Sequence, residues 1–109
     1  MRVAGYRSMW VMVLFDLPTD SRKARKQYTR FRNQLLDDGF TKMQYSVYIR
    51  HCASQENAKV HFQRVRKSVP PDGEVRVVQF TDKQFGRMEV YFGKRRVRTE
   101  TGPAQLEMF

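Results

Sequence analysis

The longest apolar run in the chain covers the seven residues from Met9 to Phe15 and leads directly into a carboxylate, Asp16. It contains three strand-favouring residues, Trp10, Val11 and Val13. No polar position alternates with the apolar ones, which is typical of a strand buried on both faces. A membrane span is excluded, because it takes about 20 apolar residues. The run therefore predicts the central strand of a sheet, with Asp16 at its carboxyl end.

Two segments, residues 21–38 and 54–69, have apolar side chains at intervals of four, three and four residues, which places them on one face of a helix. The first stripe is Ala24, Tyr28, Phe31 and Leu35, and the second is Ala58, Phe62, Val65 and Val69. The first helix has three candidate N-caps, Thr19, Asp20 and Ser21. The second begins at Ser54 and ends at the Pro70–Pro71 pair. Both helices are expected to pack on the sheet through these stripes.

Between the helices, residues 40–51 alternate between apolar and polar positions, as a strand does. One face of this segment would carry Met43, Tyr45, Val47 and Ile49. Its twelve residues exceed a mean strand of about five or six, so it either bends or forms a hairpin broken near residues 44–46. Periodicity does not choose between these. Further along, the pattern predicts a strand at 74–80, one helical turn capped at Thr81–Asp82, and a strand at 88–92.

Two helices with one apolar stripe each cover one face of a small sheet, which predicts an α+β sandwich of ferredoxin-like type. Because the first strand is apolar at both its odd and its even positions, the other face of the sheet should also be buried. A second copy of the sheet is the simplest cover, so we predict a homodimer, packed face to face or with terminal strands exchanged. The 109 residues then divide into a flexible lead-in at 1–8, a ferredoxin-like domain at 9–93 and a basic C-terminal tail at 94–109.

Positive charge is the strongest feature of the composition: 21 Lys and Arg residues against 11 Asp and Glu give a net charge of +10. This favours a polyanionic partner, and nucleic acid more than an acidic membrane, because no Lys/Arg-rich helix has an exposed aromatic face. Six cations and no acid occupy the eleven positions 22–32, where a merely solvated helix would mix the signs. They are Arg22, Lys23, Arg25, Lys26, Arg30 and Arg32, and a second basic run follows at Lys94, Arg95, Arg96 and Arg98. These two groups are the candidate nucleic-acid contacts.

The candidate for chemistry is Asp16, because ligand and catalytic groups gather at the carboxyl ends of buried strands. The alternative is an ordinary turn former or helix cap. Zinc is disfavoured at His51, Cys52 and His61, since adjacent strand residues point to opposite faces and the chain has no second cysteine. A lone cysteine also excludes an internal disulfide, and the N-terminus lacks the apolar core of a signal peptide, which favours a cytoplasmic location.

Three motifs, FDLPTD from residue 15, GFTKMQYSVYIR from residue 39 and TDKQFGRMEVYFG from residue 81, carry a resemblance to a known family. In this order, over residues 10–93, they resemble the small CRISPR-associated adaptation protein, the family numbered second among those proteins. The last motif resembles the branch that accompanies a single RNA-guided effector nuclease. The resemblance implies a βαββαβ homodimer with the hairpin at 44–46 and a strand near 88–92 that adds to the partner's sheet. It also implies a dimer that bridges two integrase-like adaptation subunits and supports a double-stranded DNA that becomes a new spacer.

Members of that family have also been described as metal-dependent nucleases on RNA or DNA, which implies a metal-ligand role for Asp16. The tyrosine that precedes this aspartate in the family is Phe15 here, so a hydroxyl is missing. A nuclease would hold Mg²⁺ between the Asp16 carboxylates of both protomers, but we expect no Glu or His beside them. A scaffold needs only charge and a dimer, and we favour it, with the nuclease as the alternative. An RNA-recognition domain is disfavoured, because EVRVVQF lacks its basic and aromatic strand motif.

Overall fold

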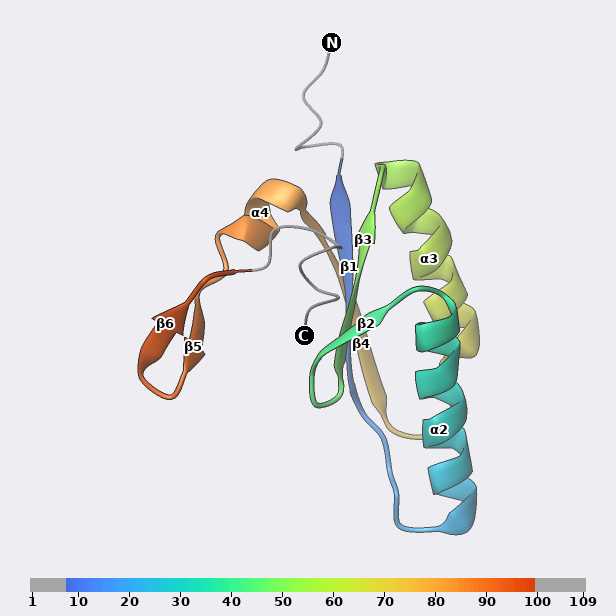
Figure 1. Ribbon diagram of the computed structural model, residues 1–109. Helices are drawn as coiled ribbons and strands as arrows, with labels where there is room; N and C mark the ends of the chain where they lie inside the picture. Colours follow the sequence, from blue (N-terminus) through green and yellow to red (C-terminus); the bar gives the residue numbers. More distant parts are fainter. Residues whose placement is uncertain (1–7, 100–109) are drawn as a thin grey trace.

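The computed structural model describes residues 8–99 and contains a four-stranded antiparallel sheet with two long helices (Figure 1). The chain runs β1 (Met9–Asp16), α2 (Arg22–Asp37), β2 (Thr41–Gln44), β3 (Val47–Cys52), α3 (Gln55–Ser68), β4 (Glu74–Thr81), α4 (Asp82–Gly86), β5 (Val90–Phe92) and β6 (Arg95–Val97). The strand order β2-β3-β1-β4 makes β1 an inner strand, and every β1 residue except Leu14 and Asp16 is buried. This βαββαβ arrangement confirms the predicted ferredoxin-like fold class.

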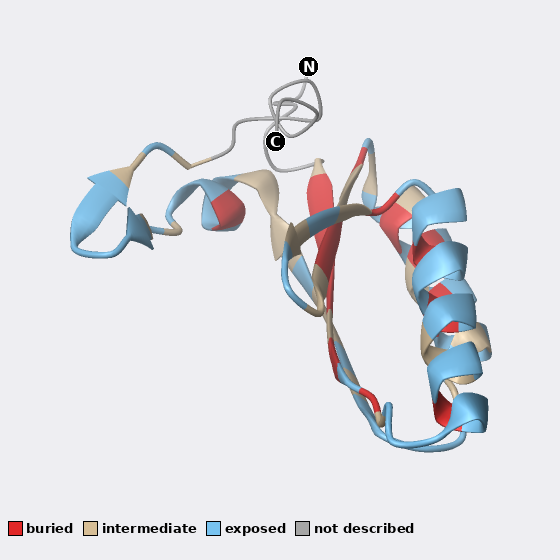
Figure 2. Cartoon of the chain, turned by 60° about the horizontal axis from the view of Figure 1, so that its bottom comes forward, coloured by how far each residue is buried: buried red, intermediate tan, exposed pale blue. Residues whose placement is uncertain are grey.

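Helices α2 and α3 cover one face of the sheet, with their inner surfaces buried and their outer surfaces exposed (Figure 2). All four residues of the predicted α2 stripe pack in the core on this side of the sheet. The α3 stripe is confirmed except at Val69, which is 44% exposed and lies beyond the last helical residue. Pro70 forces the residue before it into an extended conformation, so the helix stops one residue early. His61 is buried on the same face of α3 instead.

Each helix begins after a residue that the sequence offers as a cap, and the structure selects Ser21 from the three candidates for α2. Ser21 is the N-cap of α2 and accepts a hydrogen bond from the Ala24 N–H at 3.0 Å. Ser54 is the N-cap of α3 and accepts from the Asn57 N–H, also at 3.0 Å. After α2, Gly39 adopts the left-handed conformation with φ of +87°, which is common where a helix ends.

Residues 40–51 form a hairpin, not a bent strand. β2 and β3 pair antiparallel through a turn at residues 45–46, and Ser46 has a φ of +61°. The prediction for Tyr45 is wrong, because the turn interrupts the alternation and leaves this side chain 77% exposed. Met43 and Val47, by contrast, pack on the face of the sheet opposite the helices.

Helix α4 covers one end of this second face of the sheet. Phe85 stacks on Trp10 with ring centroids 4.0 Å apart, and the Trp10 indole N–H donates to the Asp82 carboxylate at 2.8 Å. Thr81 caps α4 as predicted, in a reciprocal capping box with Gln84. The chain itself therefore supplies part of the cover that the sequence assigns to a second copy. The remainder of the face consists of partly buried apolar side chains: Leu14, Met43, Val47, Val78, Phe80 and Met88.

A second hairpin follows α4. β5 confirms the strand predicted at 88–92, and it pairs with β6 in a separate two-stranded sheet. Residues 95–97, predicted as tail, form β6 because Gly93 turns the chain back with a φ of +63°. The hairpin projects from the side of the sheet away from α2 and α3 (Figure 1). Most of the predicted lead-in and residues 100–109 of the predicted tail lie outside the described part of the chain. Within residues 8–99, no helix is long and apolar enough to span a membrane.

Candidate functional site

Asp16 is the last residue of β1, and its side chain is exposed. Alternation along the strand places it on the same face as Trp10, Met12 and Leu14, opposite the two long helices. It is not the cap of α2, because Ser21 takes that position. The exposed carboxylate therefore stands at the edge of the apolar face.

A second carboxylate lies beside Asp16. The antiparallel register pairs Asp16 with Glu74, the first residue of β4, and paired residues project to the same face with Cβ atoms about 4.5–5.5 Å apart. Glu74 accepts a hydrogen bond from the Arg76 guanidinium at 2.7 Å, whereas Asp16 forms no ion pair within residues 8–99. The prediction that no Glu lies near Asp16 is therefore wrong. It fails because the register of β1 and β4 cannot be deduced from periodicity.

Two tight turns hold the backbone at this end of β1. On one side, the Phe15 N–H donates to the Ser46 carbonyl at 3.0 Å, which joins the β2–β3 turn to the residue before Asp16. On the other side, Gly73 has a φ of +94°, and a Cβ there would lie 2.8 Å from the Asp16 carbonyl oxygen. Only glycine allows both this conformation and this close approach. Asp16 thus has a fixed backbone position.

The carboxylates of Asp16 and Glu74 are oxygen donors of the kind that Mg²⁺ prefers. The described residues 8–99 nevertheless contain no group of three or more His, Cys, Asp or Glu side chains able to hold a metal ion. Mg²⁺ commonly keeps several waters and uses only one or two carboxylates. One chain therefore fits Mg²⁺ in donor type only, and two carboxylates would hold the ion weakly.

The cations of α2 form one exposed surface, which we call the α2 basic surface. It comprises Arg22, Lys23, Arg25, Lys26, Arg30 and Arg32. None of these side chains pairs with an acid in the described part of the chain. The first turn of α2 also contains no acidic residue, although the helix dipole would favour one there. The guanidinium of Arg25 donates instead to the Thr19 carbonyl at 3.1 Å, in the loop that follows Asp16.

The second predicted basic group is not brought together with the first. Lys94, Arg95 and Arg96 are exposed on the β5–β6 hairpin, on the other side of the sheet from α2 (Figure 1). Arg96 lies 3.9 Å from the Glu89 carboxylate. A single chain therefore presents two separate basic surfaces.

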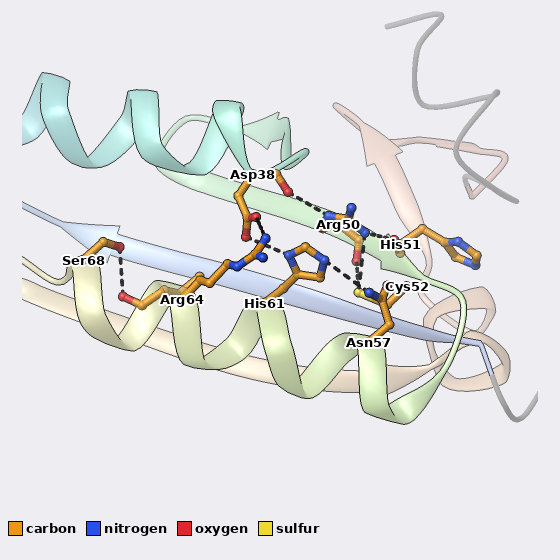
Figure 3. Close-up of polar contacts among 9 residues, drawn as sticks. Asp38, Arg50, His51, Cys52, Asn57, His61, Arg64 and Ser68 are labelled. Carbon is orange, nitrogen blue, oxygen red and sulfur yellow. Dashed lines mark hydrogen bonds and ion pairs between the residues drawn. The ribbon is translucent and has the colours of Figure 1, made fainter.

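Asp38 is the centre of a polar cluster that the sequence does not predict (Figure 3). Its two carboxylate oxygens lie 2.7 Å from His61 Nδ1 and 2.7 Å from the Arg64 guanidinium. Its backbone carbonyl accepts from Arg50 Nε at 2.8 Å. The other ring nitrogen of His61 lies 3.4 Å from the Asn57 side-chain nitrogen. This Asp38 cluster joins the end of α2 to both α3 and β3.

The cluster also sets the ionisation of Asp38. Burial raises the pKa of the carboxyl, but hydrogen bonds and charge interactions with His61 and Arg64 outweigh burial and bring the pKa below its usual value of 3.8. The positive charge of Arg64 is therefore paired with a carboxylate within the protein, unlike the charges of the α2 basic surface.

The three residues considered for zinc lie in different surroundings. His51 meets the Trp10 ring edge-on on the helix-free face, with centroids 4.9 Å apart. Cys52 belongs to the core on the helix side, and burial raises the pKa of its thiol. His61 lies in the Asp38 cluster. The predicted alternation of His51 and Cys52 across the strand is confirmed.

The fold and the site define a small ferredoxin-like domain with a basic helical layer and an exposed aspartate at the end of its inner strand. The chain belongs to the family described as CRISPR associated protein Cas2, whose model matches residues 9–88. The CRISPR-associated endoribonuclease Cas2 of Flavobacterium psychrophilum is 55% identical over 108 residues, which cover 99% of this chain and 94% of that protein. A protein of the same name from Parvibaculum lavamentivorans is 61% identical over 101 residues, which cover 93% of this chain and 100% of the relative. A third, from Paracidovorax avenae, is 42% identical over 107 residues. The family resemblance of the motifs is thus confirmed.

Proposed function

We propose that this protein is a dimeric nucleic-acid-binding scaffold of CRISPR spacer acquisition, which bridges integrase-like adaptation subunits and supports the DNA duplex that becomes the spacer. The α2 basic surface is the observation that carries this proposal. Its cations are exposed and have no acidic partner in residues 8–99. Cations in this state release counterions from a phosphate backbone when they bind it.

The dimer is proposed from the helix-free face of the sheet. Helix α4 covers the Trp10 end, and partly buried apolar side chains remain toward Leu14 and Asp16. A second copy packed there would bring two Asp16 residues into one region. Two chains of +10 each would carry +20, and duplex DNA has one phosphate per about 1.7 Å. That charge matches about 34 Å of duplex.

The salt dependence of duplex binding tests the proposal. Each phosphate contact contributes about −0.9 to the log–log slope of affinity against salt, so replacing both Arg22 and Lys26 with Ala should make the slope shallower by about two units for each protomer that loses these two contacts. All duplex sequences should be weakened alike. The matched control is the double change of Arg95 and Arg96 to Ala, which removes equal charge from the hairpin. If only the control changes the slope, duplex binds the hairpin and the proposed α2 footprint is wrong.

The second candidate function is a Mg²⁺-dependent endonuclease, and the exposed Asp16 beside Glu74 favours it. All three relatives reported above carry the word endoribonuclease in their names, which describes those proteins. In this chain, Asp16 from each protomer would hold the ion, and the fixed strand end would orient both carboxylates. A bound Mg²⁺ would polarise the phosphoryl group and activate water.

Asp16→Asn separates the two functions, because Asn is nearly isosteric with Asp and uncharged. Cleavage of RNA and DNA should be measured with Mg²⁺ and with a chelator, and the nuclease predicts that Asp16→Asn abolishes the Mg²⁺-dependent cleavage. Glu74→Gln tests whether the neighbouring carboxylate contributes to it. The scaffold predicts that Asp16→Asn retains duplex binding, dimerisation and spacer integration. Loss of integration with binding and dimerisation intact would show that Asp16 chemistry is required and that the scaffold alone is insufficient.

A further inference from the structure

Tyr45 is 77% exposed, more than the other large apolar side chains that residues 8–99 place at the surface. Its backbone is nevertheless held firmly. It occupies a two-residue turn with Ser46, whose carbonyl accepts a hydrogen bond from the Phe15 N–H at 3.0 Å. The backbone of the turn that carries the Tyr45 ring is therefore anchored to the residue that precedes Asp16.

The surroundings of the ring are positively charged. The Lys42 ammonium lies 5.6 Å from the Tyr45 ring centroid, a cation–π distance, and Lys42 has no acidic partner among the described residues. The loop after Asp16 is contacted by Arg25, so the α2 basic surface begins at the same end of β1. An exposed ring next to an unpaired cation suits a ligand with a flat π-system and a negative charge, and a nucleotide has both.

We propose that Tyr45 is a stacking site for an unpaired nucleobase beside Asp16, with Lys42 as the contact for the adjoining phosphate. This inference rests on the proposed nucleic-acid binding and adds a distinction within it. Bases inside a duplex are already stacked on their neighbours, so only a nucleotide at a frayed or single-stranded end offers a free face. Because every base has such a face, the site distinguishes unpaired from paired nucleotides and tolerates any sequence.

The test compares a blunt DNA duplex with the same duplex carrying a short single-stranded overhang, by fluorescence anisotropy at fixed salt. Wild-type protein should bind the overhang duplex more tightly. Tyr45→Ala should weaken overhang binding by about 5- to 150-fold, the range for loss of one base–aromatic stack, and should leave blunt-duplex binding unchanged. Tyr45→Phe, which keeps the ring, and Phe92→Ala, which removes an exposed aromatic from the hairpin, should bind both probes as wild type does. Lys42→Ala should weaken binding of the overhang duplex and make its salt slope shallower by about one unit.

Three results would overturn the inference. They are equal wild-type affinity for the two probes, unchanged overhang binding by Tyr45→Ala, and dissociation of the dimer by Tyr45→Ala in sedimentation velocity, which would make Tyr45 a subunit contact. The proposed function is measured separately by the wild-type blunt duplex. If that duplex fails to bind while overhang binding remains dependent on Tyr45, the scaffold proposal fails and the stacking site stands.

Discussion

Removing the Asp38 carboxylate should destabilise the fold far more than removing the carboxylate next to it in the chain. Asp38→Ala takes away the partner of His61, which is only 5% exposed, and of Arg64. Asp37 stands at the end of the same helix but is exposed, and it has no ion pair within residues 8–99. Asp37→Ala is therefore a matched control, with the same chemical change one residue away.

The size of the effect follows from what each partner loses. A buried His61 without its acceptor costs about 1–3 kcal/mol. The pair with Arg64 adds about 0–1 kcal/mol, because the Arg64 side chain is 61% exposed and screened by water. The bond from Arg50 to the Asp38 carbonyl survives, since it uses the backbone. We therefore expect a loss of about 1–4 kcal/mol in the free energy of unfolding. Asp37→Ala should instead be neutral or stabilise by about 0.3–1 kcal/mol, because a carboxylate opposes the dipole at a helix C-terminus.

Urea denaturation at pH 7 and fixed protein concentration measures both variants. With a slope of about 2 kcal/mol per molar urea, Asp38→Ala should lower the midpoint by about 0.5–2 M. Equal midpoints for the two variants would refute the role assigned to the Asp38 cluster.

The same comparison has a predicted pH dependence. The folded pKa of Asp38 lies below its usual value of 3.8, so the folded state favours the ionised carboxylate. The resulting stabilisation is complete above pH 3.8 and is lost as the pH falls from there through the folded pKa. The midpoint difference between Asp38→Ala and wild type should therefore shrink as the pH falls below 3.8. A difference that grows on acidification would contradict the sign of this shift.

Three further substitutions test single contacts. Gly73→Ala places a Cβ against the Asp16 carbonyl at a positive φ. The melting temperature should therefore fall by several degrees, roughly the effect of 1 kcal/mol in a domain of this size. An unchanged melting temperature would mean that this close approach does not require glycine. Thr81→Ala removes one half of the capping box with Gln84 and should cost about 1 kcal/mol in urea, while Thr81→Ser, which keeps the hydroxyl, should cost less. Phe85→Ala should cost about 3–5 kcal/mol, since the ring is 1% exposed, and a cost below 1 kcal/mol would show that α4 is not seated on the sheet.

Features governed by local rules can be predicted from the sequence. The apolar run of β1 needs no alternation because α2 and α3 cover one face of the sheet and α4 covers part of the other. The α2 stripe follows from helical spacing. Hydrogen-bond geometry limits the α2 cap to three candidates and gives Ser54 for α3. The exceptions arise where one residue changes the local rule. Pro70 moves Val69 out of its helix, and Tyr45 leaves the apolar face because the chain turns at that residue.

Features that join distant segments cannot be predicted in this way. Glu74 lies beside Asp16 through the register of two strands far apart in the chain, and Asp38 meets Arg64 across 26 residues. One signal does point to the Asp38 cluster: two acids end α2, where the helix dipole disfavours them. The structure explains one of them, because His61 and Arg64 of α3 both contact the Asp38 carboxylate, and leaves Asp37 exposed.

The chain contains a single tryptophan, Trp10, and it is fully buried between the sheet and α4. Its indole N–H is bound to Asp82 in α4. Intrinsic fluorescence excited at the indole therefore originates from one defined place, without any label or engineered probe. If α4 lifts from the sheet, the indole loses its stacked ring and its carboxylate partner together, and water reaches it. The emission should then shift to longer wavelength while the circular dichroism of the two long helices stays constant, so that local detachment of α4 can be observed separately from global unfolding.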